Sequence, residues 1–339
     1  MKFVPYHQLG DTPNLIVDGQ SHARTLLSLS HWPQIDTPKE LRDDLSAQIV
    51  FRYLDQPRFH VNVPAVSNDH FDEDGLVGIY TVLNPEHALK HKELLIDIAS
   101  AGDFGTYKLP QAARAAFVLS SFADKERSPL PHHIFERPYP EMASTLYQEL
   151  LPILGELLDN PQKYEQWWQA EEQFLIESTD AITSGVISIE EIPDLDLAIV
   201  HIPESWENQK AHRFTQSRRL YCHPFAINNS TSCFRILLIK GSDYELQYRY
   251  ETWVQYVSRR PMPRVNLESL ANALTEMESN GAVWKFDGVQ MITPSLKPID
   301  GARSSLDARN FISHVEEFLT TAPAAWNPYA VTVGANNAS

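Results

Sequence analysis

The stretch Ser67-Asn-Asp-His-Phe-Asp-Glu-Asp-Gly-Leu-Val-Gly78 decides how this chain is interpreted. It places His70, Asp72 and Asp74 at alternate positions, after a strand-like run and before an apolar run that is expected to be helical. A half-buried strand does not favour three ionisable side chains in alternation, whereas imidazole and carboxylate groups at a strand end are typical ligands of a divalent cation. Gly75 lets the backbone turn into the following helix. The stretch therefore predicts a metal site.

Two other interpretations fit this stretch less well. An EF-hand calcium loop beginning at His70 would need an acidic first residue and a glutamate at the twelfth position, where Thr81 stands. A nucleophilic aspartate of the haloacid-dehalogenase type would need an apolar strand directly before it, whereas Asn68–Phe71 is polar.

The first 125 residues alternate strand-like and helical runs, which favours an α/β domain with a parallel sheet. Strands are expected at 14–18, 25–30 and 59–66, and helices at 38–54, 76–83, 85–101 and 111–123. The carboxyl ends of parallel strands meet at one edge of a sheet. Asp18 and His31, which end the first two strands, are therefore expected to meet the 70–74 motif, with Asp103 approaching from a later loop.

The remaining chain is expected to form a helical connector and a second, smaller α/β domain. In the helical pattern of residues 138–190, four leucines from Leu146 to Leu157 share one face and Trp167 and Trp168 follow them, which is typical of core packing. Strand-like runs return after residue 190. The predicted organisation is a metal-binding α/β domain over 1–137, the connector over 138–190, a substrate-binding α/β domain over 191–322 and a disordered tail over 323–339.

The composition of the 339 residues is that of a soluble globular protein with a net charge of −16. This charge disfavours duplex nucleic acid and anionic membranes as partners.

Neither a membrane span nor a signal peptide is evident, and the two cysteines, Cys222 and Cys233, fit a reducing compartment, so a cytoplasmic location is expected. A zinc site made by these cysteines and His223 is a weaker alternative, because their spacing is not Cys-x-x-Cys.

His70-Phe-Asp-Glu-Asp-Gly75 resembles the first motif of the DHH phosphoesterases, which is His-x-Asp-x-Asp-Gly after a strand. That superfamily includes polyphosphatases, pyrophosphatases and nanoRNA or cyclic-dinucleotide phosphodiesterases. Asp18 resembles the second motif, Ser30-His-Trp32 a degenerate third, Ser46–Leu54 the helix that follows it, and Asp103 the fourth. The second and third motifs precede the first here, so the resemblance, which covers roughly residues 14–125, is to a circularly permuted relative.

The resemblance implies a hydrolase, a metal-dependent phosphoesterase that uses one or two Mn²⁺ or Mg²⁺ ions. The implied metal ligands are Asp18, His70, Asp72, Asp74 and Asp103. The implied catalytic residues are Asp72 and His31, with His31 acting either as a ligand or as a general acid. The implied substrate is a small phosphate compound such as a nucleotide or a short oligonucleotide.

Departures from the family pattern leave a second function open. Ser30 and Trp32 stand where the family has an aspartate and its second histidine, and His133 could replace the latter in space. The chain could therefore be a non-catalytic nucleotide-binding or scaffolding protein with a degenerate site. Whether it forms a homodimer is also left open by the sequence.

The family's second domain holds substrate phosphate with arginines and a glycine-rich GGGH-like segment, and no such segment occurs here. Instead, four arginines lie within the sixteen residues from Arg249 to Arg264. Guanidinium groups suit phosphate oxygens, so Arg259, Arg260 and Arg264 are expected to bind the substrate. The alternative is an ordinary strand with arginines exposed on one face.

Overall fold

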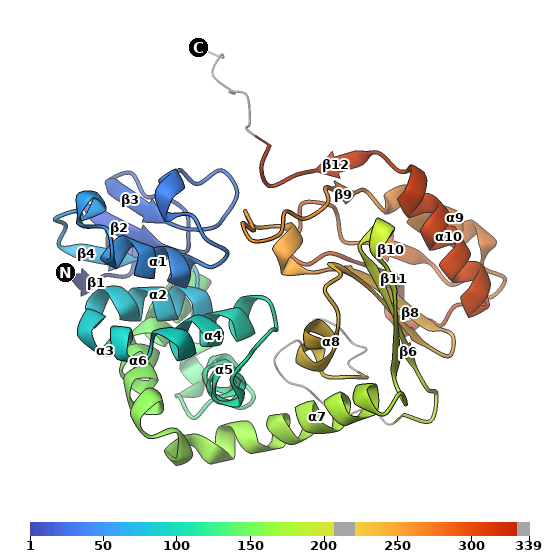
Figure 1. Ribbon diagram of the computed structural model, residues 1–339, viewed down its shortest axis with the longest axis horizontal. Helices are drawn as coiled ribbons and strands as arrows, with labels where there is room; N and C mark the ends of the chain where they lie inside the picture. The colour runs from blue at the N-terminus through green and yellow to red at the C-terminus, as the bar shows by residue number, and fades with distance from the viewer. Residues whose placement is uncertain (207–220, 331–339) are drawn as a thin grey trace, which may run out of the picture. The chain divides into compact units, whose positions relative to one another are not determined.

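The computed structural model describes residues 1–206 and 221–330, and these divide into two compact units (Figure 1). The first unit consists of Met1–Phe174 with the short segment Tyr256–Ser258, and the second contains the remaining described residues from Leu175 onward. The division falls inside α7 (Glu165–Thr183), so the predicted connector 138–190 is shared between the two units.

The first unit contains a four-stranded sheet in the order β1-β4-β2-β3, with all neighbouring strands parallel. Its strands are β1 (Lys2–Phe3), β2 (Asn14–Val17), β3 (Thr25–Leu29) and β4 (Ala65–Ser67). The α/β class and the parallel sheet are therefore confirmed. The strand predicted at 59–66 is wrong in its bounds, because a 3₁₀ turn occupies Pro57–Phe59 and only the end of the run reaches the sheet.

In the described part of the first unit, six α-helices before α7 accompany this sheet. They are α1 (Ser46–Leu54), α2 (Glu73–Leu83), α3 (Pro85–Lys90), α4 (Lys92–Asp103), α5 (Pro110–Ala123) and α6 (Tyr139–Asp159). Helix α2 is the central one, because it packs against α1, α4 and α6 and is buried from Glu73 to Thr81. Its backbone approaches β2 closely at Gly78, where a Cβ atom would lie only 2.5 Å from Val17 Cγ1.

The predicted helices are confirmed in part. The helix expected at 111–123 is α5, and the one expected at 76–83 is α2, which begins three residues earlier at Glu73. The single helix expected at 85–101 is two helices, because the backbone leaves helical geometry at His91. The helix expected at 38–54 begins only at Ser46, after a 3₁₀ turn at Lys39–Leu41.

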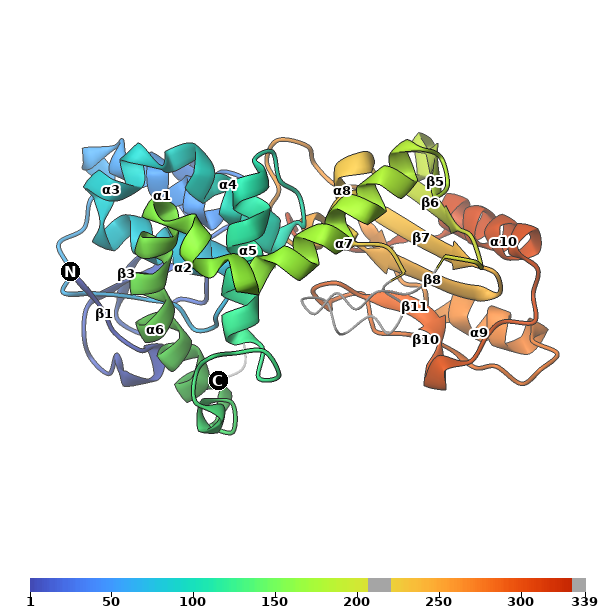
Figure 2. The ribbon, with the colours of Figure 1, turned by 90° about the horizontal axis from the view of Figure 1, so that it is seen from below.

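The second unit contains a mixed six-stranded sheet in the order β10-β11-β8-β7-β6-β5. Its strands are β5 (Ser188–Ile192), β6 (Leu197–Ile202), β7 (Arg235–Lys240), β8 (Asp243–Tyr248), β10 (Trp284–Phe286) and β11 (Ser295–Pro298). Helices α9 (Glu268–Met277) and α10 (Ala308–Thr321) lie on one side of the sheet and α8 (Pro224–Ser230) on the other (Figures 1 and 2). Leu237 and Leu246 of the sheet share a core with Leu274 and Phe311 of the two helices.

The segment after residue 322 is not entirely the disordered tail that was expected. Ala324–Trp326 forms β12, which pairs with β9 (Arg264–Val265) in a separate antiparallel sheet. Residues 331–339 of the predicted tail lie outside the described residues.

Candidate metal centre

The candidate site lies where three neighbouring strands of the parallel sheet end. Strands β4, β2 and β3 are neighbours in the sheet (Figure 1). Asp18 follows β2, His31 comes two residues after β3, and the 70–74 motif follows β4, which is the expected convergence. Asp18 is fully buried and has a φ of 56°, a left-handed conformation that is uncommon outside glycine. Such backbone strain persists where the surrounding structure fixes it and is frequent at functional sites.

Asp18 lies between the two histidines of the centre. It belongs to two groups of potential ligands, one with His70 and Asp72 and the other with His31 and Asp74, whose ligand atoms lie within 4.8 Å of one another. Its Oδ1 is 3.5 Å from His31 Nε2, and its Oδ2 is 3.4 Å from His70 Nε2. The two groups therefore share the carboxylate of Asp18.

Asp103 also reaches the centre, from the last residue of α4. Its Oδ2 lies 3.4 Å from His31 Nε2. Within the described part of the chain, Asp103 Oδ2 and Asp18 Oδ2 are buried and accept no well-aligned hydrogen bond, although His70 Nε2 lies 3.4 Å from Asp18 Oδ2. Buried carboxylate oxygens that lack well-placed donors are costly, and a divalent cation would satisfy them.

The proton position on His31 follows from a backbone contact. Its Nδ1 lies 2.5 Å from the carbonyl oxygen of Asp44, which can only accept, so Nδ1 carries the proton. Burial lowers the pKa of His31 to about 4, so the ring is neutral near pH 7. Its Nε2 therefore presents a lone pair towards the carboxylates of Asp18 and Asp103. This arrangement is repulsive unless a proton or a cation lies between them.

His70 is held on both sides by carboxylates and on one face by a ring. Its Nε2 is 2.7 Å from Asp72 Oδ2, and its Nδ1 is 3.2 Å from Asp69 Oδ1. Burial alone would lower the pKa of His70, but the surrounding carboxylates, Asp72 foremost, raise it well above its usual value. Trp32 stacks on the imidazole with ring centroids 4.7 Å apart. Trp32, which the sequence comparison set against the second histidine of the DHH phosphoesterases, therefore packs directly on His70.

Asp72 and Asp74 also organise helix ends. Asp72 is the N-cap of α2, and its Oδ1 accepts the amide of Gly75 at 2.8 Å. The two oxygens of Asp74 accept the amides of Ser46 and Ala47 at the start of α1, each at 2.7 Å. Amides at a helix N-terminus favour a carboxylate. Asp74 is therefore a helix-binding residue whose oxygens also face His31, at 3.9 Å from its Nε2.

Burial and crowded charge control protonation in this centre. Burial, reinforced by the nearby Asp72 charge, raises the pKa of Asp18 to about 7. Burial and neighbouring carboxylates raise the pKa values of Asp74 and Asp103 well above the usual range. Burial also acts to raise the pKa of Asp72, but His70 outweighs it and lowers that pKa. Without metal the centre retains protons, and a bound divalent cation would displace them.

Sequence reasoning missed three residues that position the ligands. Asp69 contacts His70, the carbonyl of Asp44 fixes His31, and the hydroxyl of Ser46 donates to Asp18 Oδ1 at 2.6 Å. Asp69 is adjacent to His70 in the sequence and could have been considered with it. The other two come from the loop before α1 and from its first residue, and no sequence spacing links them to the ligands.

The predicted substrate arginines belong to the second unit and differ in availability. Arg264 is fully buried and donates four hydrogen bonds, to the hydroxyl of Thr252 and the carbonyls of Val289, Met291 and Ile292. Its role is therefore structural, which corrects the prediction that it binds substrate. Arg259 and Arg260 are exposed; Arg259 pairs with Asp196 at 3.2 Å, and Arg260 lies over the ring of Tyr329. Phosphate binding by these two stays a prediction.

Two alternative ligand sets receive no support from the described residues. His132 and His133 are exposed, and neither belongs to a group of three potential ligands in the part of the chain that is described. No such group there contains a cysteine either. Burial raises the pKa of Cys222 to about 12, which keeps the thiol protonated and unsuited to zinc.

The fold and the site define an α/β protein with a candidate metal centre at the carboxyl edge of a parallel sheet. A model described as "Family of unknown function (DUF6687)" matches residues 1–330, and the chain belongs to this family. No curated protein and no solved structure matches the chain. Among the described residues, no helix is both long enough and apolar enough to cross a membrane.

Proposed function

We propose that this chain is a metal-dependent phosphoesterase, related to the DHH phosphoesterases by circular permutation. The observation that carries the proposal is the position of Asp18 between His31 and His70, where the neutral His31 directs a lone pair at buried carboxylates. Imidazole and carboxylate groups in one pocket are ligands suited to Mn²⁺ and, through the oxygens, to Mg²⁺. One or two ions would fit the two overlapping ligand groups.

The ligands divide into two sets around the shared aspartate. His70 and Asp72 would hold one ion with Asp18, and a second ion would be held by Asp18 with His31, Asp74 and Asp103. When bound, the ion supplies a Lewis acid that polarises a phosphate oxygen and lowers the pKa of water.

The protein's own residues orient the ligands and define the open side. His31 serves as a ligand and not as a general acid, because its pKa of about 4 leaves Nε2, the nitrogen that faces the centre, without a proton near pH 7. The side chains of Asp18 and His31 are fully buried, whereas those of His70 and Asp72 are 18% and 26% exposed. A phosphate group would therefore approach from the side of His70 and Asp72.

The substrate class we propose is a nucleotide, a short oligonucleotide or a related small phosphate compound, hydrolysed in the cytoplasm. The net charge of −16 opposes binding of a polyanion to the surface as a whole, so a compact substrate that meets the metal is favoured. Arg259 and Arg260 are the exposed candidates for contacts with its phosphate.

A non-catalytic nucleotide-binding protein is a second candidate, favoured by the contacts of Asp74 and Trp32. Both oxygens of Asp74 already accept helix amides, and Trp32 packs on His70 where a further ligand would stand in the family pattern. A centre with fewer available ligands could retain one ion and bind phosphate without turning it over.

The test compares metal content and hydrolysis in matched variants. Asp72→Asn retains a side chain that can cap α2 but removes one charge, and Glu149→Gln makes the same change at an exposed position of α6. We expect near-stoichiometric manganese by elemental mass spectrometry, and Mn²⁺-dependent hydrolysis of bis-p-nitrophenyl phosphate or a dinucleotide, in the wild type and in Glu149→Gln only. Full activity in Asp72→Asn would exclude the proposal. Nucleotide binding without turnover under several metals would favour the second candidate.

A further inference from the structure

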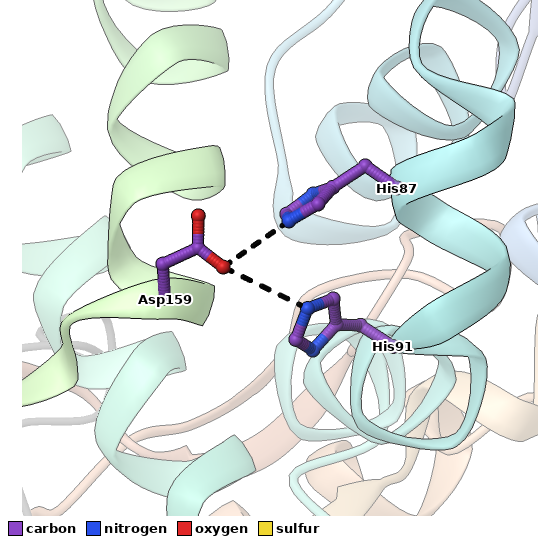
Figure 3. Close-up of side chains that lie close together, drawn as sticks. All are labelled: His87, His91 and Asp159. Atoms are coloured by element: carbon purple, nitrogen blue, oxygen red, sulfur yellow. Dashed lines mark hydrogen bonds and ion pairs between the residues drawn. The ribbon is translucent and has the colours of Figure 1, made fainter.

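A second group of ligand side chains lies in the first unit and shares no residue with the centre described above. His87 belongs to α3, His91 precedes α4, and Asp159 is the last residue of α6 (Figure 3). The three side chains point toward one another, and their ligand atoms lie within 4.8 Å of each other. Asp159 is 72 residues from His87 in the sequence, so the group joins distant segments.

The distances suit a small tetrahedral ion. Asp159 Oδ1 lies 3.2 Å from His87 Nε2 and 3.9 Å from His91 Nε2. Ligands at zinc distances in a tetrahedron are roughly 3.3 Å apart. The rings of His87 and His91 have centroids 4.7 Å apart, so the two imidazoles lie close together across the junction of α3 and α4.

An outer contact orients His87 toward this point. Its Nδ1 lies 2.6 Å from the hydroxyl of Tyr80, which leaves Nε2 directed at Asp159. Histidines that bind metal commonly use the other ring nitrogen in such a contact. Gly155, one turn before Asp159 on α6, leaves room for this hydroxyl, because a Cβ there would lie 3.0 Å from it.

We propose that His87, His91 and Asp159 bind one Zn²⁺ ion, which links the α3–α4 segment to the end of α6. Two imidazoles and one carboxylate favour zinc over manganese or magnesium, which take mainly oxygen ligands. The side chains of His87 and His91 are 29% and 27% exposed, so solvent can fill the fourth position. This site is independent of the proposed phosphoesterase activity.

The test is a Zn²⁺ titration of the full chain against a chromogenic chelator. We expect the wild type to bind one Zn²⁺ ion per chain tightly at this site. His91→Ala should lose this ion, and Asp159→Asn should bind it at least tenfold more weakly. Tyr80→Phe removes only the orienting hydroxyl and should weaken binding of the same ion about tenfold. His132→Ala is the matched control, since His132 is exposed and pairs with Glu136 outside the candidate site, and it should bind Zn²⁺ as the wild type does.

Two further comparisons distinguish this site from zinc bound at the Asp18 centre and from zinc bound by the two histidines alone. Asp72→Asn should retain the Zn²⁺ ion that His91→Ala loses, which shows that this ion is not held in the candidate metal centre around Asp18. If His91→Ala lost the Zn²⁺ ion but Asp159→Asn bound Zn²⁺ with unchanged affinity, the site would be a histidine pair without the carboxylate, and the proposal would be overturned. Equal stoichiometry and affinity in all variants would overturn it as well. Circular dichroism of each variant without zinc checks that the fold is retained.

Discussion

At the level of single residues, the orientations of His31 and His70 determine which ring nitrogens the candidate metal centre can offer to a cation. The carbonyl of Asp44 fixes the proton of His31, and the carboxylate of Asp69 contacts His70 on the side away from Asp72. Asp69 Oδ1 also accepts the amide of Gln20 at 3.3 Å, so it is itself held in place. A carboxylate in this position raises the basicity of a metal-binding imidazole. Asp69 is therefore a positioning residue.

Replacing Asp69 should weaken metal binding without removing a ligand. Asp69→Asn retains an oxygen that can accept from Nδ1 but loses the charge, so we expect Mn²⁺ to bind about tenfold more weakly. Asp69→Ala also loses the contact with His70, so its affinity for Mn²⁺ should be up to about 100-fold lower than that of the wild type. The Mn²⁺ affinities of both variants are measured by titration, with free Mn²⁺ followed by electron paramagnetic resonance. Glu149→Gln is the control, because it makes the same change in charge at an exposed position. Unchanged affinity in Asp69→Ala would show that His70 is not a ligand.

At the level of elements, the candidate ligands Asp18 and Asp74 also take part in the contacts that join α1 and α2 to the sheet. Asp74 of α2 accepts the first amides of α1, and Ser46 of α1 donates to Asp18 at the end of β2. Helix α2 also approaches β2 directly at Gly78, next to Val17. The geometry of the centre therefore depends on how closely these three elements pack.

The close approach at Gly78 gives a stability prediction. A methyl group there would clash with Val17, so Gly78→Ala is expected to lower the free energy of unfolding by about 1–3 kcal/mol, although alanine is the better helix former. Urea denaturation measures the loss. Val17→Ala in the same chain removes the clashing methyl groups, so the double variant should be less destabilised than the sum of the two single variants. Strict additivity would mean that the two positions do not contact.

The sequence predicted the features that depend on local pattern. The parallel sheet and the meeting of Asp18, His31 and His70 followed from strand ends and alternation, and the structure has both. The helix contacts of Asp74 and the burial of Arg264 could not be predicted, because their partners are 12 to 28 residues away and are brought close only by tertiary packing. For the second ligand group, the signal in the sequence is the spacing of His87 and His91, four positions apart within the predicted helix at 85–101.

The burial of Arg264 predicts a structural effect in the second unit. Lysine cannot reproduce the planar fork that donates to Thr252 and to the carbonyls of residues 289, 291 and 292. Arg264→Lys should therefore lower the free energy of unfolding by about 3 kcal/mol or more, because the buried hydroxyl of Thr252 and three partly buried carbonyls lose their donor. Arg260→Lys, the same change at an exposed arginine, should stay within about 0.5 kcal/mol. Equal effects in denaturant melts would argue against the structural role.

At the level of the whole molecule, the centre links metal binding, stability and pH. The pKa of Asp18 is about 7 in the folded protein against a usual 3.8, so the metal-free fold binds this proton more tightly than the unfolded chain does. The resulting stability is fully present below pH 3.8 and is lost as the pH rises through about 7. His31 acts in the opposite sense, since its pKa falls from 6.5 to about 4 and its contribution is lost as the pH falls through that range.

A bound cation takes the place of the proton on Asp18, so Mn²⁺ should stabilise the protein more at high pH than at low pH. We expect the rise in Tm on adding Mn²⁺ to be larger at pH 8 than at pH 5.5. Below the pKa of Asp18 the apparent affinity should fall about tenfold per pH unit for each proton displaced. Titration calorimetry at pH 6.5 in two buffers of different ionisation enthalpy counts those protons directly. Equal Tm shifts at both pH values, with no proton released, would mean that Mn²⁺ binds away from the buried carboxylates and that their raised pKa values have no part in metal binding.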